Sequence, residues 1–170
     1  MRIGFYLTQT IILCYRLFFN YFIYILKGIV TELNNVNLNK ADSCSVAKAA
    51  VAILIEKKAL NIRLYEVGED NPMTDYYINA TGRSLTQVAA LADELVFKLS
   101  EAGLNDGKIE GKRGNSWILI DYGTVIINVF DKESREFYNL DRLMPESSLR
   151  DISDIEKIVD EKMKINNTEE

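Results

Sequence analysis

The stretch NSWILIDYGTVIINVFDKESREFY, from Asn115 to Tyr138, combines a strand pattern with an unusual mix of charge and aromatic residues. Two apolar runs flank Tyr122-Gly123, and this pattern predicts a β-hairpin with a tight turn at that dipeptide. Charged and aromatic residues crowd the segment after the second strand. Such crowding at the end of a hairpin fits a catalytic site, a nucleic-acid surface or a docking patch for another protein.

The composition and charge of the whole chain narrow these three classes. With 170 residues, 48% hydrophobic and 26% charged, the chain is long enough for one domain with a core and extensions. Residues 1–40 hold four Lys or Arg and one Glu, hence +3, and the net charge of −5 leaves −8 for the remainder. An acidic body argues against binding nucleic acid mainly through its phosphates. We therefore expect little direct RNA binding and a basic protein partner.

The residue types present exclude several kinds of chemistry. The chain has no histidine, so Ser-His-Asp catalysis, Cys-His catalysis and His-ligated metal sites are ruled out. Its two cysteines, Cys14 and Cys44, both lie in the N-terminal region and imply neither a disulfide framework nor a zinc site.

The N-terminal segment, residues 3–30, is apolar and aromatic over a length sufficient to span a bilayer, for which about 20 residues are needed. Arg16 near its centre costs about 2.5 to 3.5 kcal/mol on insertion, which the many Ile, Leu and Phe residues could offset. No small-residue cleavage pattern follows, which argues against a secretory signal. Two interpretations stay open: a membrane anchor, or a segment upstream of the true translation start that is not normally made.

The central part of the chain alternates predicted helices and strands. Residues 42–59 predict an amphipathic helix with an Asp or Ser cap, and residues 61–67 and 75–80 predict strands joined by a turn at Pro72. Ser84 and Gln87 form a capping-box pattern that starts a second helix, which Gly103 ends. The apolar face of this helix consists of Val88, Leu91, Leu95, Leu99 and Ala102.

The C-terminal part continues through a linker that contains three glycines to the hairpin, and then to a short turn, YNLDRLM, before Pro145. After Pro145 an appended amphipathic helix is expected, with Leu149, Ile152, Ile155, Val159 and Met163 on one face. This order predicts an α/β fold with a mixed β-sheet flanked by helices. The expected organisation is an N-terminal extension (1–40), a domain (41–144), and a helix with a polar tail (145–170).

Two short patterns suggest chemistry, and each also has a plain structural explanation. TGRS, Thr81 to Ser84, precedes a helix, a place where a phosphate could bind, but its residues are explained as turn and cap residues. Asp75 and Asp121 could hold magnesium for nucleotidyl transfer. They lack the closely spaced double-Asp motif of such enzymes, and an Asp before a Tyr-Gly turn commonly serves the turn itself.

The succession TDYYINATGRS, ALADELVFKLSEAGL and SWILIDYGTVIINVFDKESREFYNLDRL resembles the ribosomal silencing factor family, also called Iojap-like proteins. The resemblance spans about 100 residues, from Ser45 to Met144, an ordinary domain size. It implies a nucleotidyltransferase-like fold without catalytic residues, no enzymatic activity and no cofactor or metal. It further implies a cytoplasmic translational repressor that binds the large ribosomal subunit through ribosomal protein L-fourteen and blocks association with the small subunit.

Three positions depart from the family pattern. The family usually has Gly-Asp after the aromatic turn and a His later in that strand, where this chain has Thr124 and Asn128. The family also commonly ends in Leu-Trp, where this chain has Leu143-Met144. If these positions contact the ribosome, they bear on affinity or partner preference.

The resemblance and the chemistry together place a protein-docking face at and after the hairpin, which could also pair two copies of the chain as a homodimer. Two other functions remain as alternatives: a magnesium-dependent nucleotidyltransferase-like enzyme that uses Asp75 and Asp121, and a membrane-attached interaction protein. The residues expected in the docking face, or directly behind it, are Trp117, Asp121, Tyr122, Arg135, Glu136, Phe137 and Tyr138.

Overall fold

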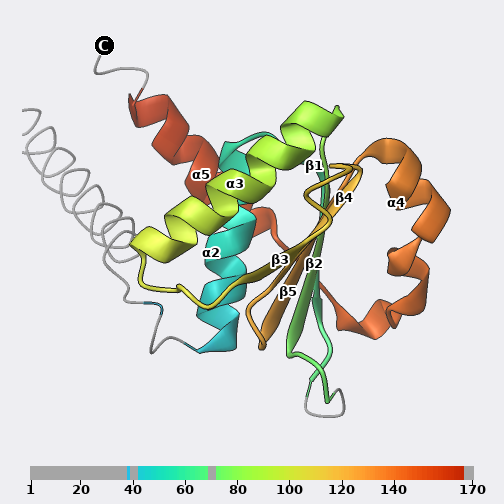
Figure 1. Cartoon of the computed structure of the whole chain (residues 1–170). Coiled ribbons are helices and arrows are strands. Elements are labelled where there is room, and N and C mark those ends of the chain that lie inside the picture. The colour runs from blue at the N-terminus through green and yellow to red at the C-terminus, as the bar shows by residue number, and fades with distance from the viewer. Residues whose placement is uncertain (1–37, 39–41, 69–71, 167–170) are drawn as a thin grey trace, which may run out of the picture. The chain divides into compact units, whose positions relative to one another are not determined.

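A six-stranded mixed β-sheet forms the centre of the domain (Figure 1). The computed structural model describes Leu38, residues 42–68 and residues 72–166. The order of strands across the sheet is β3-β4-β5-β2-β1-β6; β2 and β5 are parallel, and the other described pairs are antiparallel. The strands are β1 (Leu60–Glu66), β2 (Tyr76–Thr81), β3 (Lys108–Glu110), β4 (Trp117–Asp121), β5 (Val125–Phe130) and β6 (Leu149–Arg150).

The helices divide between the two faces of this sheet. Helices α2, α3 and α5 gather on one side, and α4 lies on the other, as Figure 1 shows. The helices are α2 (Ser43–Glu56), α3 (Leu85–Glu101), α4 (Lys132–Tyr138) and α5 (Ser153–Asn166), with 3-10 turns η2 (Leu140–Leu143) and η3 (Glu146–Ser148). The predicted fold class, a mixed sheet flanked by helices, is confirmed.

Helices α2 and α3 both begin at the cap residues that the sequence predicted. The Asp42 carboxylate accepts a hydrogen bond from the Ser45 amide at 2.7 Å at the start of α2. The Ser84 hydroxyl oxygen accepts from the Gln87 amide at 3.2 Å at the start of α3, and the Gln87 side chain accepts from the Arg83 amide at 2.8 Å. These bonds satisfy amides that a helix end leaves without partners. The apolar face predicted for α3 is buried at Val88, Leu91, Leu95 and Leu99.

The core lies between the sheet and helices α2, α3 and α5. Side chains that alternate along the strands point to this helix-covered face, and β5 is buried on both faces. The strand residues that fill the helix-covered face, all less than 2% exposed, are Ile78, Ala80, Ile118, Ile120, Val125, Ile127 and Val129.

Two local predictions were wrong, and one helix formed in a segment for which no structure had been predicted. The linker contains a strand, β3, which pairs with β4 in register Ile109 to Ile120. The charged run after the hairpin is a helix, α4, because the Asp131 carboxylate caps it at the Ser134 amide at 2.7 Å. Leu149 and Ile152 are not on the C-terminal helix, because α5 begins at Ser153. Leu149 instead lies in strand β6, where it pairs with Tyr65 of β1.

Candidate functional site

A cluster of aromatic side chains lies where the hairpin meets α4. The Trp117 ring stacks on Phe130 with centroids 5.1 Å apart and leans on Tyr138 at 4.8 Å. Phe137 meets Tyr138 edge-on at 5.0 Å. Exposure increases outward through this aromatic cluster, because Phe130 is fully buried, Tyr138 is 49% exposed and Phe137 is 81% exposed. The cluster therefore presents a wide apolar surface that the sheet supports from behind.

A chain of buried amide hydrogen bonds supports the aromatic cluster. The Trp117 indole N–H donates to Asn128 Oδ1 at 3.0 Å, and Asn128 Nδ2 donates to Asn79 Oδ1 at 3.0 Å. Asn79 Nδ2 donates in turn to Asp141 Oδ1, also at 3.0 Å. Asn79 and Asn128 are 0% and 1% exposed, so these partners remove the cost of burying two amides. The network fixes the Trp117 ring against the sheet.

The network ends at an ion pair between α4 and η2. Arg135 Nε donates to Asp141 Oδ2 at 2.7 Å, and Tyr65 Oη donates to Asp141 Oδ1 at 2.8 Å. Burial raises the pKa of the Asp141 carboxyl, but hydrogen bonds from Arg135, Asn79 and Tyr65 outweigh it and hold the pKa below its usual value. The Arg135 guanidinium also lies over the Phe130 ring, 5.6 Å from its centroid. Arg135 and Asp141 thus hold α4 and η2 together and against the sheet.

The seven residues predicted for the docking face fall into two groups. Glu136, Phe137 and Tyr138 are exposed on α4. The other four lie behind them or at the hairpin turn. Arg135 is 9% exposed, so its role in the structure is internal.

Asp121 and Tyr122 belong to the hairpin turn. The Asp121 carboxylate accepts a hydrogen bond from the Gly123 amide at 2.7 Å, which is the turn role that its position predicts. Tyr122 is half-buried, and loss of hydration raises the pKa of its phenol to about 12. The ring packs so closely on Gly107 that a Cβ there would come within 2.7 Å of Tyr122 Cε1.

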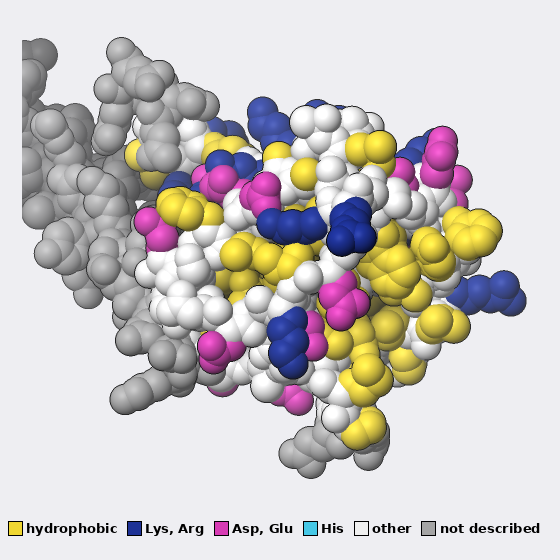
Figure 2. All heavy atoms as spheres, viewed as in Figure 1, with side chains coloured by type: hydrophobic (Ala, Val, Ile, Leu, Met, Phe, Trp, Pro, Cys, Tyr) yellow, Lys and Arg dark blue, Asp and Glu magenta, His cyan; other side chains and the backbone are white. Residues whose placement is uncertain are grey.

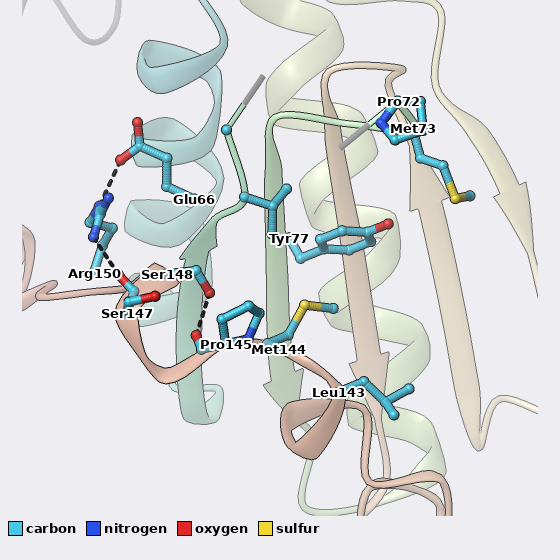
Figure 3. A pocket seen from close by; sticks show the side chains of 12 residues that line it. Glu66, Pro72, Met73, Tyr77, Leu143, Met144, Pro145, Ser147, Ser148 and Arg150 are labelled. Carbon is cyan, nitrogen blue, oxygen red and sulfur yellow. Dashed lines mark hydrogen bonds and ion pairs between the residues drawn. The ribbon is translucent and has the colours of Figure 1, made fainter. Parts of the chain in front are cut away.

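A groove beside the aromatic cluster was not predicted from the sequence. Its volume is about 650 Å³, and it lies between the end of the β1–β2 connection and the segment from Leu143 to Arg150. Figure 3 shows Met73, Tyr77, Leu143 and Met144 on one side of Pro145, with the Glu66–Arg150 ion pair, 2.6 Å long, on the other. We call this feature the methionine groove. No local pattern could reveal it, because its walls come from segments about 70 positions apart.

The aromatic cluster and the methionine groove lie on the face of the sheet that α2, α3 and α5 do not cover. We call this side the open face. Figure 2 shows hydrophobic side chains along it, from the region of α4 down towards the β1–β2 connection. Met73 is 70% exposed and Leu143 is 73% exposed. Exposed apolar side chains that gather on one face typically mark an interaction site.

The structure describes some of the residues on which the alternative functions depend. Asp121 is engaged in its turn, and within residues 42–68 and 72–166 no group of three or more Asp, Glu, His or Cys is arranged to hold a metal ion. Across the part of the chain that the structure describes, no helix is long and apolar enough to cross a membrane. The predicted membrane segment, residues 3–30, lies outside the described residues.

The fold and the open face define a mixed α/β domain that exposes apolar side chains on one face of its sheet. Residues 40–170 match the family described as "Ribosomal silencing factor during starvation", and the chain belongs to this family. It is 33% identical to the Bacillus subtilis ribosomal silencing factor over 108 residues, which cover 64% of this chain and 92% of that protein.

Two further relatives extend this comparison. A crystal structure of a Chromobacterium violaceum protein superposes with a TM-score of 0.59 at 30% identity and covers 61% of this chain and 87% of that one. The mouse protein named "Mitochondrial assembly of ribosomal large subunit protein 1" is 29% identical over 96 residues, which cover 55% of this chain and 42% of that protein.

Proposed function

We propose that this chain represses translation in the cytoplasm by binding the large ribosomal subunit and blocking its association with the small subunit. The partner on the large subunit is ribosomal protein L-fourteen, and the open face is the docking surface. The protein acts by occupying a surface and needs no cofactor. Family membership and the name of the mouse relative support a role at the large subunit.

The observation that carries this proposal is the exposed aromatic pair on α4. Tyr138 is 49% exposed and Phe137 is 81% exposed, although both rest on a rigid, hydrogen-bonded support. Aromatic side chains on a firm base are typical anchors of protein interfaces, because little conformational entropy is lost when they bind. The methionine groove continues the same apolar surface, and flexible methionine side chains adapt to a partner's shape.

The charge of the domain favours a basic partner. The chain outside residues 1–40 carries −8, and Glu133 and Glu136 are exposed beside the aromatic pair. Acidic groups at the rim of an interface accelerate association with a basic protein, while the apolar centre supplies most of the affinity. In the absence of ribosomes, the same open face is proposed to pair with a second copy of the chain.

The test is a binding and joining experiment with purified subunits. The full-length protein should sediment with isolated large subunits and should reduce the light-scattering signal that rises when large and small subunits join. Small subunits alone provide the negative control. Absence of binding to large subunits at modest salt concentration would overturn the proposal.

A further inference from the structure

The parallel strands β2 and β5 end side by side, and the segments that follow them go to opposite faces of the sheet. After β2 the chain enters α3 on the helix-covered face, and after β5 it enters α4 on the open face (Figure 1). In α/β proteins, a crevice opens outside the carboxyl ends of neighbouring parallel strands whose connections diverge in this way, and ligands bind there. The topology therefore marks one edge of this sheet as a binding position.

A pocket of about 340 Å³ occupies that position. Thr81, Gly82 and Arg83 line it from the end of β2, and α4 contributes Lys132, Arg135 and Glu136. The Gly82 amide donates to the Phe130 carbonyl at 2.8 Å, which ties the two strand ends together. A Cβ at Gly82 would lie 2.9 Å from the Val88 nitrogen, so a glycine lets the chain pass closely over α3 and sets the position of Arg83.

Positive charge prevails among the groups around this pocket. Arg83 is exposed, and none of the ion pairs among the described residues involves its guanidinium. Lys132 has a loose ion pair with Glu136, at 4.0 Å. Arg135 donates to Thr81 Oγ1 at 3.4 Å, although the charge of its guanidinium is shared with Asp141 behind the pocket.

Gln87 ties the end of α2 to the backbone at Arg83. The Gln87 side-chain amide donates to the Lys57 and Lys58 carbonyls, at 3.4 Å each, while its oxygen accepts from the Arg83 amide. One side chain therefore brings the end of α2 next to Arg83. Lys57 is paired with Glu94 at 2.8 Å, and Lys58 is exposed.

We propose that this pocket contacts a backbone phosphate of the large subunit's RNA. The inference rests on the proposed function, which brings the open face against the large subunit. Lys132, Arg135 and Glu136 belong to the same helix as the docking aromatics Phe137 and Tyr138, so docking through α4 brings the pocket to the neighbouring subunit surface. Guanidinium and ammonium groups are the usual partners of phosphate.

This inference refines the expectation of little direct RNA binding. The charge of −8 outside residues 1–40 disfavours a broad phosphate-binding surface, but a single contact depends only on local charge. Screening confines the repulsion from distant carboxylates to about 8 Å at physiological salt. The contact adds to protein docking and does not replace it.

The experiment measures how binding to large subunits depends on salt. A protein that neutralises one phosphate contributes about 0.7 to 0.9 to the slope of log K against log salt concentration. Arg83→Ala should lower the slope by about that amount and weaken binding several-fold at low salt. Arg83→Lys should retain most of the slope. The matched control is Lys157→Ala, which removes one exposed cation on α5 and should leave the slope unchanged.

A second arm uses isolated ribosomal protein L-fourteen, which carries no RNA. Arg83→Ala should bind it as tightly as the unaltered protein. Equal weakening on the protein and on the subunit would overturn the RNA assignment, because the cation would then contact protein. An unchanged slope on the subunit would overturn the phosphate contact alone, whereas failure of the unaltered protein to bind either target would overturn the proposed function.

A third arm tests free nucleotides as the source of the phosphate. ATP and GTP are added to the protein alone while the backbone amide signals of Gly82 and Arg83 are followed by NMR. We expect no saturable shift at millimolar nucleotide. Saturable shifts that disappear in Arg83→Ala would assign the pocket to a nucleotide and overturn the RNA assignment.

Discussion

The two faces of the central sheet are built from the same strands and differ in every other respect. The helix-covered face holds aliphatic side chains such as Ile78, Ile120 and Ile127, each 0% exposed. The open face holds amides, an ion pair and aromatic rings, and its outermost groups are in solvent. The helix-covered face supplies most of the folding stability. The polar interactions of the open face fix the positions of the exposed groups above them.

The difference shows how a small domain can keep an apolar surface exposed without losing its fold. Burial of aliphatic groups on one face supplies a large favourable free energy of folding. The open face gains less from burial, so hydrogen bonds and the Arg135–Asp141 pair fix its shape. Substitutions on the helix-covered face should therefore change mainly the free energy of unfolding. Substitutions of exposed residues on the open face should change mainly the binding of the large subunit.

The largest expected effect is on the helix-covered face. Ile127→Ala should lower the free energy of unfolding by about 4 kcal/mol, because a fully buried branched side chain leaves a cavity. Urea denaturation measures this change. Phe137→Ala on the open face is the control and should cost less than about 0.5 kcal/mol, since the side chain is 81% exposed. Similar losses in both variants would contradict the division between the faces.

The next effect concerns the polar support of the open face. Asp141→Asn should lower the free energy of unfolding by about 3 kcal/mol near neutral pH, because Arg135 is left nearly buried without its counter-ion. Trp117 is the one tryptophan in the chain, so a shift in its fluorescence should report movement of α4 in protein that is still folded. Unaltered fluorescence and subunit binding would show that the ion pair does not position the aromatic cluster.

The Arg135–Asp141 ion pair should make the free energy of unfolding depend on pH, with higher stability above the pKa of Asp141. The folded pKa of Asp141 is below the unfolded value of about 3.9, so the carboxylate's contribution to stability is present above that pH. It is lost as the pH falls through the folded pKa. The difference in unfolding free energy between the unaltered protein and Asp141→Asn should therefore shrink in acid. A difference that stays constant down to about pH 2 would count against this pairing.

Tyr138→Ala should alter binding more than stability. Truncating a supported interface aromatic typically costs about 2 kcal/mol, or roughly 30-fold in affinity for the large subunit. Phe97→Ala is the matched control, because Phe97 is a 56% exposed aromatic on α3, which lies on the helix-covered side. Thermal melting should first show that both variants fold. Equal binding by the two variants would remove the open face from the docking site.

The sequence predicted those parts of the fold that local patterns determine. The cap and apolar face of α3 could be predicted because each helix signal lies within one segment. Helix α4 was missed because its seven residues lack an apolar face, and Arg135 is secured by Asp141, outside the helix. Strands β3 and β6 were missed because they are three and two residues long and depend on their neighbours.

The candidate site could be predicted in part. Phe137 and Tyr138 could be chosen as candidates because aromatics beside charges are uncommon on a solvated surface, and both are exposed. The sequence could not separate the exposed Tyr138 from the buried Arg135, since both are expected anchors and only their partners distinguish them. The methionine groove could not be foreseen, because it forms only when the segment from Leu143 to Arg150 lies beside the β1–β2 connection.

The smallest expected effects are those of the exposed charges on α4. Lys132 and Glu136 side chains are 83% and 70% exposed and lie 4.0 Å apart, so the pair adds little stability. Glu136→Lys places a positive charge against a basic partner and should weaken binding to isolated ribosomal protein L-fourteen by less than about 1 kcal/mol, mainly through slower association. Lys132→Ala should have a still smaller effect on the same target. Because salt screens exposed charges, the Glu136→Lys effect should fade as salt rises. Stopped-flow association at two salt concentrations measures this, and a salt-independent loss would place Glu136 in the buried centre of the interface and not at its rim.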